Sequence, residues 1–224
     1  MSQAASLLHI RELLRSKFPA AQSVPVKTDA VCTGVECLDQ MGMQAGRLHE
    51  IVSASRGAGA GLLLSALLEC WSERRQPVAL VDGADVFNPQ DVTAETRERL
   101  LWLRCRNVDQ AVKGADLLLR DGNISHVLMD MELCPASSMR KVPAQAWHRL
   151  RLLAEKSGAL CCVFTAFQTV PCARSRLVMK LPHGLEAMDR PRAELLARLR
   201  GGVGRGALGG EAEEESSAPY FFSA

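Results

Sequence analysis

The stretch SASRGAGAGLLL, from Ser53 to Leu64, combines closely spaced glycines with the start of an apolar helix. Glycines at such spacing between a strand and a helix are typical of a loop that binds phosphate through backbone N–H groups. A working loop follows the pattern GxxxxGK[ST], in which the lysine contacts the phosphates and the hydroxyl holds magnesium. Alignment of Gly59 with the second glycine places Ala60 and Gly61 at those two positions, so both side chains are missing.

Three aspartates follow apolar runs and are the carboxylates that a nucleotide site would use. In HVLMD, residues 126–130, four mostly apolar residues precede Asp130, the arrangement in which an aspartate orients magnesium. VDGAD places Asp82 and Asp85 where parallel strands deliver side chains to the carboxyl edge of a sheet. That Asp82 and Asp130 only cap the next turn is an alternative. The residues of this degenerate nucleotide site are Gly57, Gly59, Gly61 and Asp130. We expect no cofactor, with weak binding of ATP and magnesium left open.

Alternating apolar runs and helical periodicities predict the elements that position these residues. Strands are predicted at residues 47–53, 78–82, 97–106 (entered from a helical segment), 126–131, 159–165 and 176–181. Helices are predicted at residues 62–75, 109–120 and 144–156. Strands that alternate with helices of this length predict an α/β fold with a mostly parallel sheet flanked by helices.

One core domain is expected, at residues 31–200, between two extensions. Residues 1–30 hold a predicted amphipathic helix, SLLHIRELLRSKF, and a linker. Residues 201–224 are glycine-rich, then acidic, then aromatic, which predicts a disordered tail. Apolar runs are too short to cross a bilayer and the N-terminus lacks the apolar segment of a signal peptide, so we expect a cytoplasmic protein without membrane contact.

The eight cysteines include no CxxC pair, and the five histidines show no ligand spacing. Most of the cysteines lie within apolar stretches, where a free thiol behaves as a small hydrophobic side chain. We therefore predict buried free thiols and no metal site.

The formal net charge of +2 conceals a basic segment. Residues 140–205 contain 13 basic and 4 acidic side chains. The candidates for contact with the backbone of single-stranded DNA in this segment are Arg174, Arg176, Arg192 and Arg198. A solvated helical face with basic ends explains the same composition equally well.

Two segments resemble the core of the bacterial recombinase RecA. TGVECLDQMGMQAGRLHEI, residues 33–51, is similar to the beginning of that core, with its threonine-glycine, leucine-aspartate and glycine-arginine steps before a strand. VALVDGADVFNP, residues 78–89, resembles the second strand of the recombinase and its acidic turn. The resemblance implies a RecA-like fold.

A closer resemblance is to the ImuA family, RecA-like accessory proteins of bacterial mutagenic repair. It is carried by Arg47–Glu50, Leu101–Trp102, Leu119–Gly122 and His126–Asp130, and by two longer segments, RLRLLAEKSGALCCVF (149–164) and CARSRLVMKL (172–181). Members commonly lack a standard phosphate loop, which agrees with the missing lysine. The resemblance implies action with a catalytically inactive Y-family polymerase homologue (ImuB) and an error-prone replicative-type polymerase, and contact with RecA.

The last four residues, FFSA, have the Phe-x-x-Ala spacing by which recombinases of this superfamily dock a neighbouring protomer. This resemblance implies that Phe221 and Ala224 would fill two pockets on a partner, with the preceding EAEEE steering the segment toward a basic surface. An inert tail is the alternative.

Three functions are therefore open. The first is a non-catalytic RecA-like accessory protein that links RecA to a translesion polymerase complex. The second is a DNA-dependent ATPase in which Asp130 holds magnesium and Asp82 or Asp85 activates water. The third is a regulator that uses the same fold only to cap RecA. Loss of the loop lysine argues against the second, because it removes a charge that stabilises the transition state.

Overall fold

The computed structural model describes residues 30–53, 55, 58–179, 189–199 and 201–205. Its strands are β1 (Leu48–Ser53), β2 (Val78–Asp82), β3 (Leu100–Arg104), β4 (His126–Asp130), β5 (Leu160–Thr165), β6 (Ser175–Met179) and β7 (Gly201–Arg205). Its helices are α2 (Glu36–Met41), α3 (Ala60–Glu73), α4 (Ala94–Arg99), α5 (Val108–Asp121), α6 (Ala136–Met139), α7 (Ala144–Ser157) and α8 (Arg192–Arg198), with a 3₁₀ turn η2 (Pro89–Asp91).

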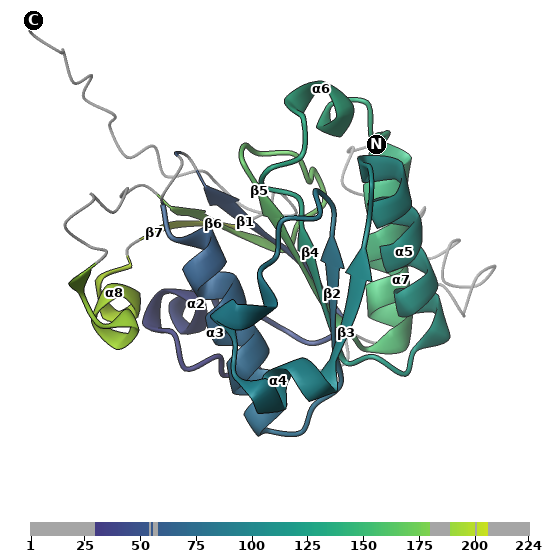
Figure 1. Cartoon of the computed structure of the whole chain (residues 1–224). Helices are drawn as coiled ribbons and strands as arrows, with labels where there is room; N and C mark the ends of the chain where they lie inside the picture. Colours follow the sequence, from purple (N-terminus) through teal and green to yellow (C-terminus); the bar gives the residue numbers. More distant parts are fainter. Residues whose placement is uncertain (1–29, 54, 56–57, 180–188, 200, 206–224) are drawn as a thin grey trace, which may run out of the picture.

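The strands form one sheet in the order β3-β2-β4-β5-β1-β6-β7 (Figure 1). The first six of these are mutually parallel, and only β7 pairs antiparallel, with β6. The predicted α/β fold with a mostly parallel sheet is confirmed. Because every strand of the centre is buried on both faces, as in β1, β2 and β5, these segments read as continuous apolar runs in the sequence.

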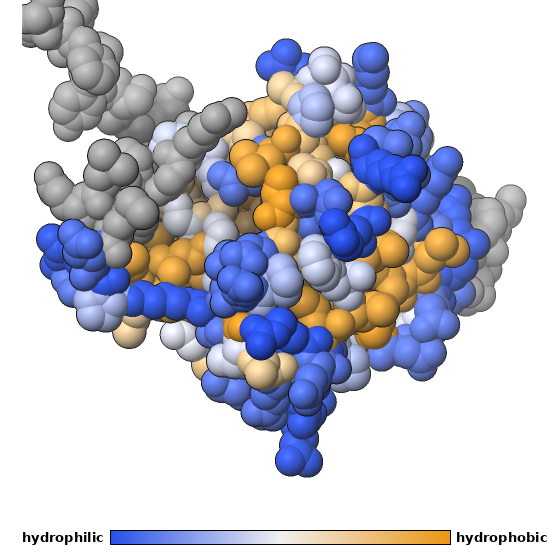
Figure 2. Space-filling view, viewed as in Figure 1, coloured by the Kyte–Doolittle hydropathy of each residue, from blue (hydrophilic) through white to orange (hydrophobic). Residues whose placement is uncertain are grey.

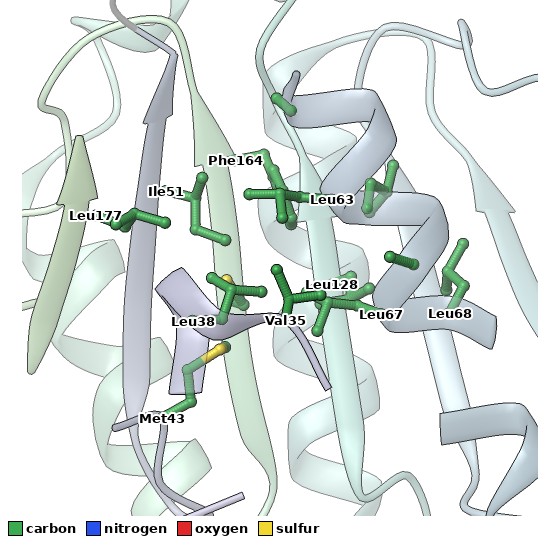
Figure 3. Packing of buried hydrophobic residues seen from close by; sticks show 14 of the residues in the cluster. Val35, Leu38, Met43, Ile51, Leu63, Leu67, Leu68, Leu128, Phe164 and Leu177 are labelled. Atoms are coloured by element: carbon green, nitrogen blue, oxygen red, sulfur yellow. The ribbon is translucent and has the colours of Figure 1, made fainter. Parts of the chain in front are cut away.

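Two hydrophobic cores lie on opposite faces of the sheet. On one face, α2 and α3 cover side chains that include Ile51, Leu128 and Phe164 (Figure 3). On the other face, α5 and α7 cover alternate residues of the same strands, such as Val127 and Val163. This alternation fixes which strand-end side chains face the glycine loop, since that loop leads into α3.

Turn and cap residues set the ends of the helices. Asn107 caps α5, with its side-chain oxygen accepting a hydrogen bond from the N–H of Gln110. Both α5 and α7 end at a glycine in the left-handed region, Gly122 and Gly158. The two helices lie side by side on one face of the sheet (Figure 1).

The prediction of a disordered tail is wrong for its first five residues. Gly201–Arg205 form β7, which pairs with β6 from Met179↔Gly201 to Ser175↔Arg205. The composition misleads because strand pairing at an edge uses backbone N–H and C=O groups and needs no apolar side chain. Residues 206–224, the predicted N-terminal helix and most of the linker lie outside the described residues.

All eight cysteines are free, and five of them are buried. Cys70 and Cys172 are partly buried and Cys32 is exposed, so the expectation of buried thiols holds for five of the eight positions. Within the described ranges no helix is long and apolar enough to span a membrane.

One edge of the sheet is apolar and partly exposed. Strand β3 pairs only with β2, and its Leu101 is 47% exposed. In Figure 2 hydrophilic side chains cover the α8 and α4 ends of the view, while hydrophobic ones reach the surface between them and toward β3.

Candidate functional site

The glycine loop lies between β1 and α3, as predicted. Gly59 immediately precedes the helix with φ of 92°, a conformation that side-chain-bearing residues rarely adopt. Among the described residues no side chain caps the first turn of α3. A glycine is thus required at position 59 for the turn itself, whether or not a phosphate binds. Gly57 lies outside the described residues.

Gly61 is in the first turn of α3, beside open space. A Cβ atom added there would meet nothing within 4 Å. The residue borders a cavity of about 360 Å³ between α3, η2 and α8, which is lined by Gly61, Leu62, Ser65, Asp91, Arg190, Arg192 and Leu195. The Ser65 hydroxyl donates to the carbonyl of Gly61 at 2.9 Å, so its proton is already engaged within the helix.

Asp82 is buried, and its carboxylate accepts hydrogen bonds from the turn after β2 and from β3. It accepts hydrogen bonds from the backbone N–H groups of Val86 and Phe87, at 3.1 and 3.0 Å. It also accepts one from the indole N–H of Trp102 at 3.3 Å. These contacts agree with the capping alternative and leave Asp82 poorly placed to activate water.

Asp85 is exposed and paired with an arginine. Arg104 Nε and Nη2 donate to the two carboxylate oxygens at 2.6 and 2.9 Å. Hydrogen bonds from Arg104 lower the pKa of Asp85 below its usual value. Asp85 adopts a positive φ of 55°, which a short polar side chain tolerates better than a branched one. The ion pair with Arg104 therefore makes Asp85 a poor general base.

Asp130 ends β4, in register with Asp82 of the neighbouring strand. Its Oδ1 accepts a hydrogen bond from the N–H of Glu132 at 3.2 Å, and its carbonyl accepts one from Gly83. Burial raises the pKa of Asp130 to about 6. Burial also raises the pKa of Glu132. Asp130 and Glu132 are therefore two carboxyl groups with raised pKa values, two residues apart at the carboxyl edge of the sheet.

The raised pKa of Asp130 has a consequence for stability that can be measured. When the pKa of a carboxyl is higher in the folded than in the unfolded protein, the free energy of unfolding falls as pH rises from about 4 to about 6. The Asp130→Asn variant should therefore unfold in urea with a free energy roughly 1–2 kcal/mol above that of the wild type at pH 7.5. At pH 4 the two proteins should be equally stable. The same difference at both pH values would contradict this account.

The four predicted DNA-binding arginines lie in different surroundings. Arg176 is 18% exposed and pairs with the buried Glu50, its Nε lying 2.6 Å from Oε2. On α8, Arg192 pairs with Glu69 at 3.0 Å and Arg198 pairs with Glu194 at 2.7 Å. Arg174 is exposed and makes no ion pair with any described residue. The DNA contact stays a prediction, and the structure places its four residues in three different surroundings.

Glu50 is a buried carboxylate with a structural role that the sequence pattern did not single out. It is fully buried on β1 and accepts hydrogen bonds from Thr165 Oγ1, Thr169 N and Val170 N at 2.7–3.1 Å, besides that from Arg176. Its carboxylate thereby fixes the connection between β5 and β6. A charged residue in the otherwise apolar run LHEIVS was the available signal.

The chain matches no protein-family model and no curated protein sequence. In the described part of the chain, no three His, Cys, Asp or Glu side chains gather in a way that could hold a metal ion. Phe221 and Ala224, the predicted docking residues, lie outside the described residues.

Proposed function

We propose that this chain is a non-catalytic RecA-like accessory protein of bacterial DNA-damage tolerance, which links RecA to an error-prone polymerase complex. The observation that carries the proposal is the state of the glycine loop. The loop has the position of a phosphate loop in a parallel α/β sheet, yet Ala60 and Gly61 follow Gly59 where lysine and a hydroxyl would stand.

The surrounding carboxylates support a non-catalytic reading. Hydrolysis of ATP needs a cation at the phosphates and an ionised base or magnesium ligand nearby. Asp82 is engaged by three donors and Asp85 by Arg104. A site built in this way favours a non-catalytic accessory protein over an ATPase.

The named partners come from the resemblance to the ImuA family. The described residues of its longer segments, 149–164 and 172–179, form part of α7, then β5 and β6. RecA, an ImuB-type polymerase homologue and an error-prone replicative-type polymerase are the partners proposed, with single-stranded DNA as a further ligand.

A DNA-dependent ATPase is the second candidate, and one observation favours it. The cavity beside Gly61 is lined by Arg190, just before α8, and Arg192, the first residue of α8, two cations from far along the chain. Both are engaged by carboxylates, Arg190 by Glu194 and Arg192 by Glu69. Their charge is therefore largely compensated, which is why this candidate ranks second.

Partner binding tests the proposal. The purified protein, immobilised on a biosensor, is exposed to RecA filaments on single-stranded DNA and separately to the ImuB-type protein. Saturable binding of both, with equal affinity in the presence and absence of ATP, is the expected result. Binding of RecA alone would favour the filament-capping alternative, and binding of neither would contradict the proposal.

A further inference from the structure

The outward face of α7 is basic. Its exposed residues include His148, Arg149, Leu152 and Lys156, while Trp147, Leu150 and Ala154 turn inward to the core. We define the α7 basic face by six cations and the two carboxylates among them: Arg47, Arg120, Arg149, Arg151, Lys156 and Arg174, with Asp116 and Glu155.

One carboxylate of this face bridges α5 and α7. Asp116 of α5 accepts hydrogen bonds from Arg120 on its own helix and from Arg149 on α7. Burial raises the pKa of Asp116, but the hydrogen bonds from Arg149 and Arg120 outweigh it and hold the pKa below its usual value. Asp116 is 14% exposed, whereas Arg149 and Arg120 are 60% and 54% exposed. The partly buried Asp116 therefore holds both guanidinium groups in place while they remain exposed to solvent.

A second carboxylate repeats this arrangement. Glu155 accepts from Arg151 one turn earlier on α7, at 3.1 Å, and from Arg47, which precedes β1. Arg47 and Arg151 are 23% and 29% exposed. Each bridge thus places two guanidinium groups around one carboxylate and leaves one positive charge uncompensated.

Arg174 adds a further cation next to the second bridge. Its backbone N–H donates to the carbonyl of Leu48 at 2.7 Å, which places it beside the residue that follows Arg47. Burial, together with the smaller effect of the charges of Arg174 and Arg47, lowers the pKa of His49 to about 4. The histidine is neutral at physiological pH and adds no charge of its own.

We propose that the α7 basic face binds the sugar-phosphate backbone of single-stranded DNA. The choice of single-stranded DNA as the ligand rests on the proposed function. The position of the binding surface follows from the two carboxylate bridges at Asp116 and Glu155. Guanidinium forks match pairs of phosphate oxygens, and ion pairs that already fix them reduce the ordering that binding requires. Six cations against two carboxylates supply the uncompensated charge that a phosphate chain needs.

This surface differs from the one that the sequence suggested. Of the four arginines that the sequence predicted to contact DNA, only Arg174 belongs to the α7 basic face. Arg192 and Arg198 lie on α8, which packs against α3 on the opposite side of the sheet (Figure 1). Arg176 serves the buried Glu50.

Fluorescence anisotropy with a labelled 20-nucleotide oligo-dT, over a series of salt concentrations, tests the proposal on the full chain. The variant replaces Arg149, Arg151 and Arg174 with Gln. We expect binding at least about tenfold weaker, and a plot of log affinity against log salt that is shallower by about 2, since each lost contact with a single strand removes about 0.7. Melting temperatures checked in parallel should stay close to the wild type, because these pairs are at the surface.

The matched control replaces three exposed arginines of the opposite layer, Arg75, Arg99 and Arg198, with Gln. This control removes the same charge and should leave affinity and salt slope near wild-type values. Equal losses in both triple variants would overturn the proposal, as would displacement of DNA by a poly-glutamate peptide at equal charge concentration. Absence of DNA binding by the wild type would overturn it too, while RecA binding in the biosensor experiment would leave the proposed function standing.

Discussion

Replacement of Arg176 with alanine is expected to lower the free energy of unfolding by about 3 kcal/mol. The guanidinium group donates to Glu50 at 2.6 Å and to the carbonyl of Val170 at 2.8 Å. Glu50 is fully buried, so the variant would leave a carboxylate in the interior without its countercharge. This loss in free energy of unfolding is at the lower end of the range for a broken buried ion pair. The reason is that Arg176 is itself 18% exposed, so water can reach the space that it vacates.

Urea denaturation of three variants separates this role from a surface one. Arg174→Ala, two residues away and exposed, should change the free energy of unfolding by less than about 0.5 kcal/mol. The double variant Glu50→Gln with Arg176→Gln removes both charges and should recover part of the loss. Equal stability of the Arg176→Ala and Arg174→Ala proteins would refute the buried pair. It follows that Arg176 variants are unsuitable for testing DNA contact, because any loss of binding would be mixed with loss of structure.

Asp82→Ala is expected to destabilise the protein by a similar amount, about 3 kcal/mol, because three donors lose their acceptor. The donors are the N–H groups of Val86 and Phe87 and the indole of Trp102. Val86 is 46% exposed, so water can replace part of what is lost there. The indole of Trp102 also contacts Phe87 edge-on, and the loss should loosen that aromatic pair.

Asp82→Asn is the informative companion, since it keeps one acceptor oxygen and similar volume. Its thermal unfolding should lie between those of the wild type and Asp82→Ala. A purely catalytic Asp82 predicts the opposite pattern, with wild-type stability in both variants and loss of ATP turnover. The two accounts are distinguished by melting temperature alone, before any activity is measured.

Much of the fold could be predicted because its signals are local. The strands of the parallel sheet are short apolar runs buried on both faces, and long helices such as α5 and α7 show a clear period. The glycine loop was placed correctly because Gly59 is needed at a positive φ. The short helices α2, α6 and α8 have four to seven residues, too few for a periodic pattern.

The candidate site was less predictable because its contacts are distant in sequence. Glu50 and Arg176 are separated by 126 residues, and Glu69 and Arg192 by 123. The excess of basic residues at 140–205 was countable, but which of them meet a carboxylate depends on the topology of the sheet. The same holds for Asp116, whose two arginines come from α5 and α7.

Hydrolysis of ATP by the purified protein tests the central claim most directly. It is measured with and without single-stranded DNA and RecA, against Asp130→Ala as the control. We predict no turnover above that of the control under any condition, because a phosphate loop without its lysine and with its carboxylates engaged should lose several orders of magnitude in rate. Turnover that is stimulated by DNA and lost in Asp130→Ala would contradict the account and identify the chain as an ATPase.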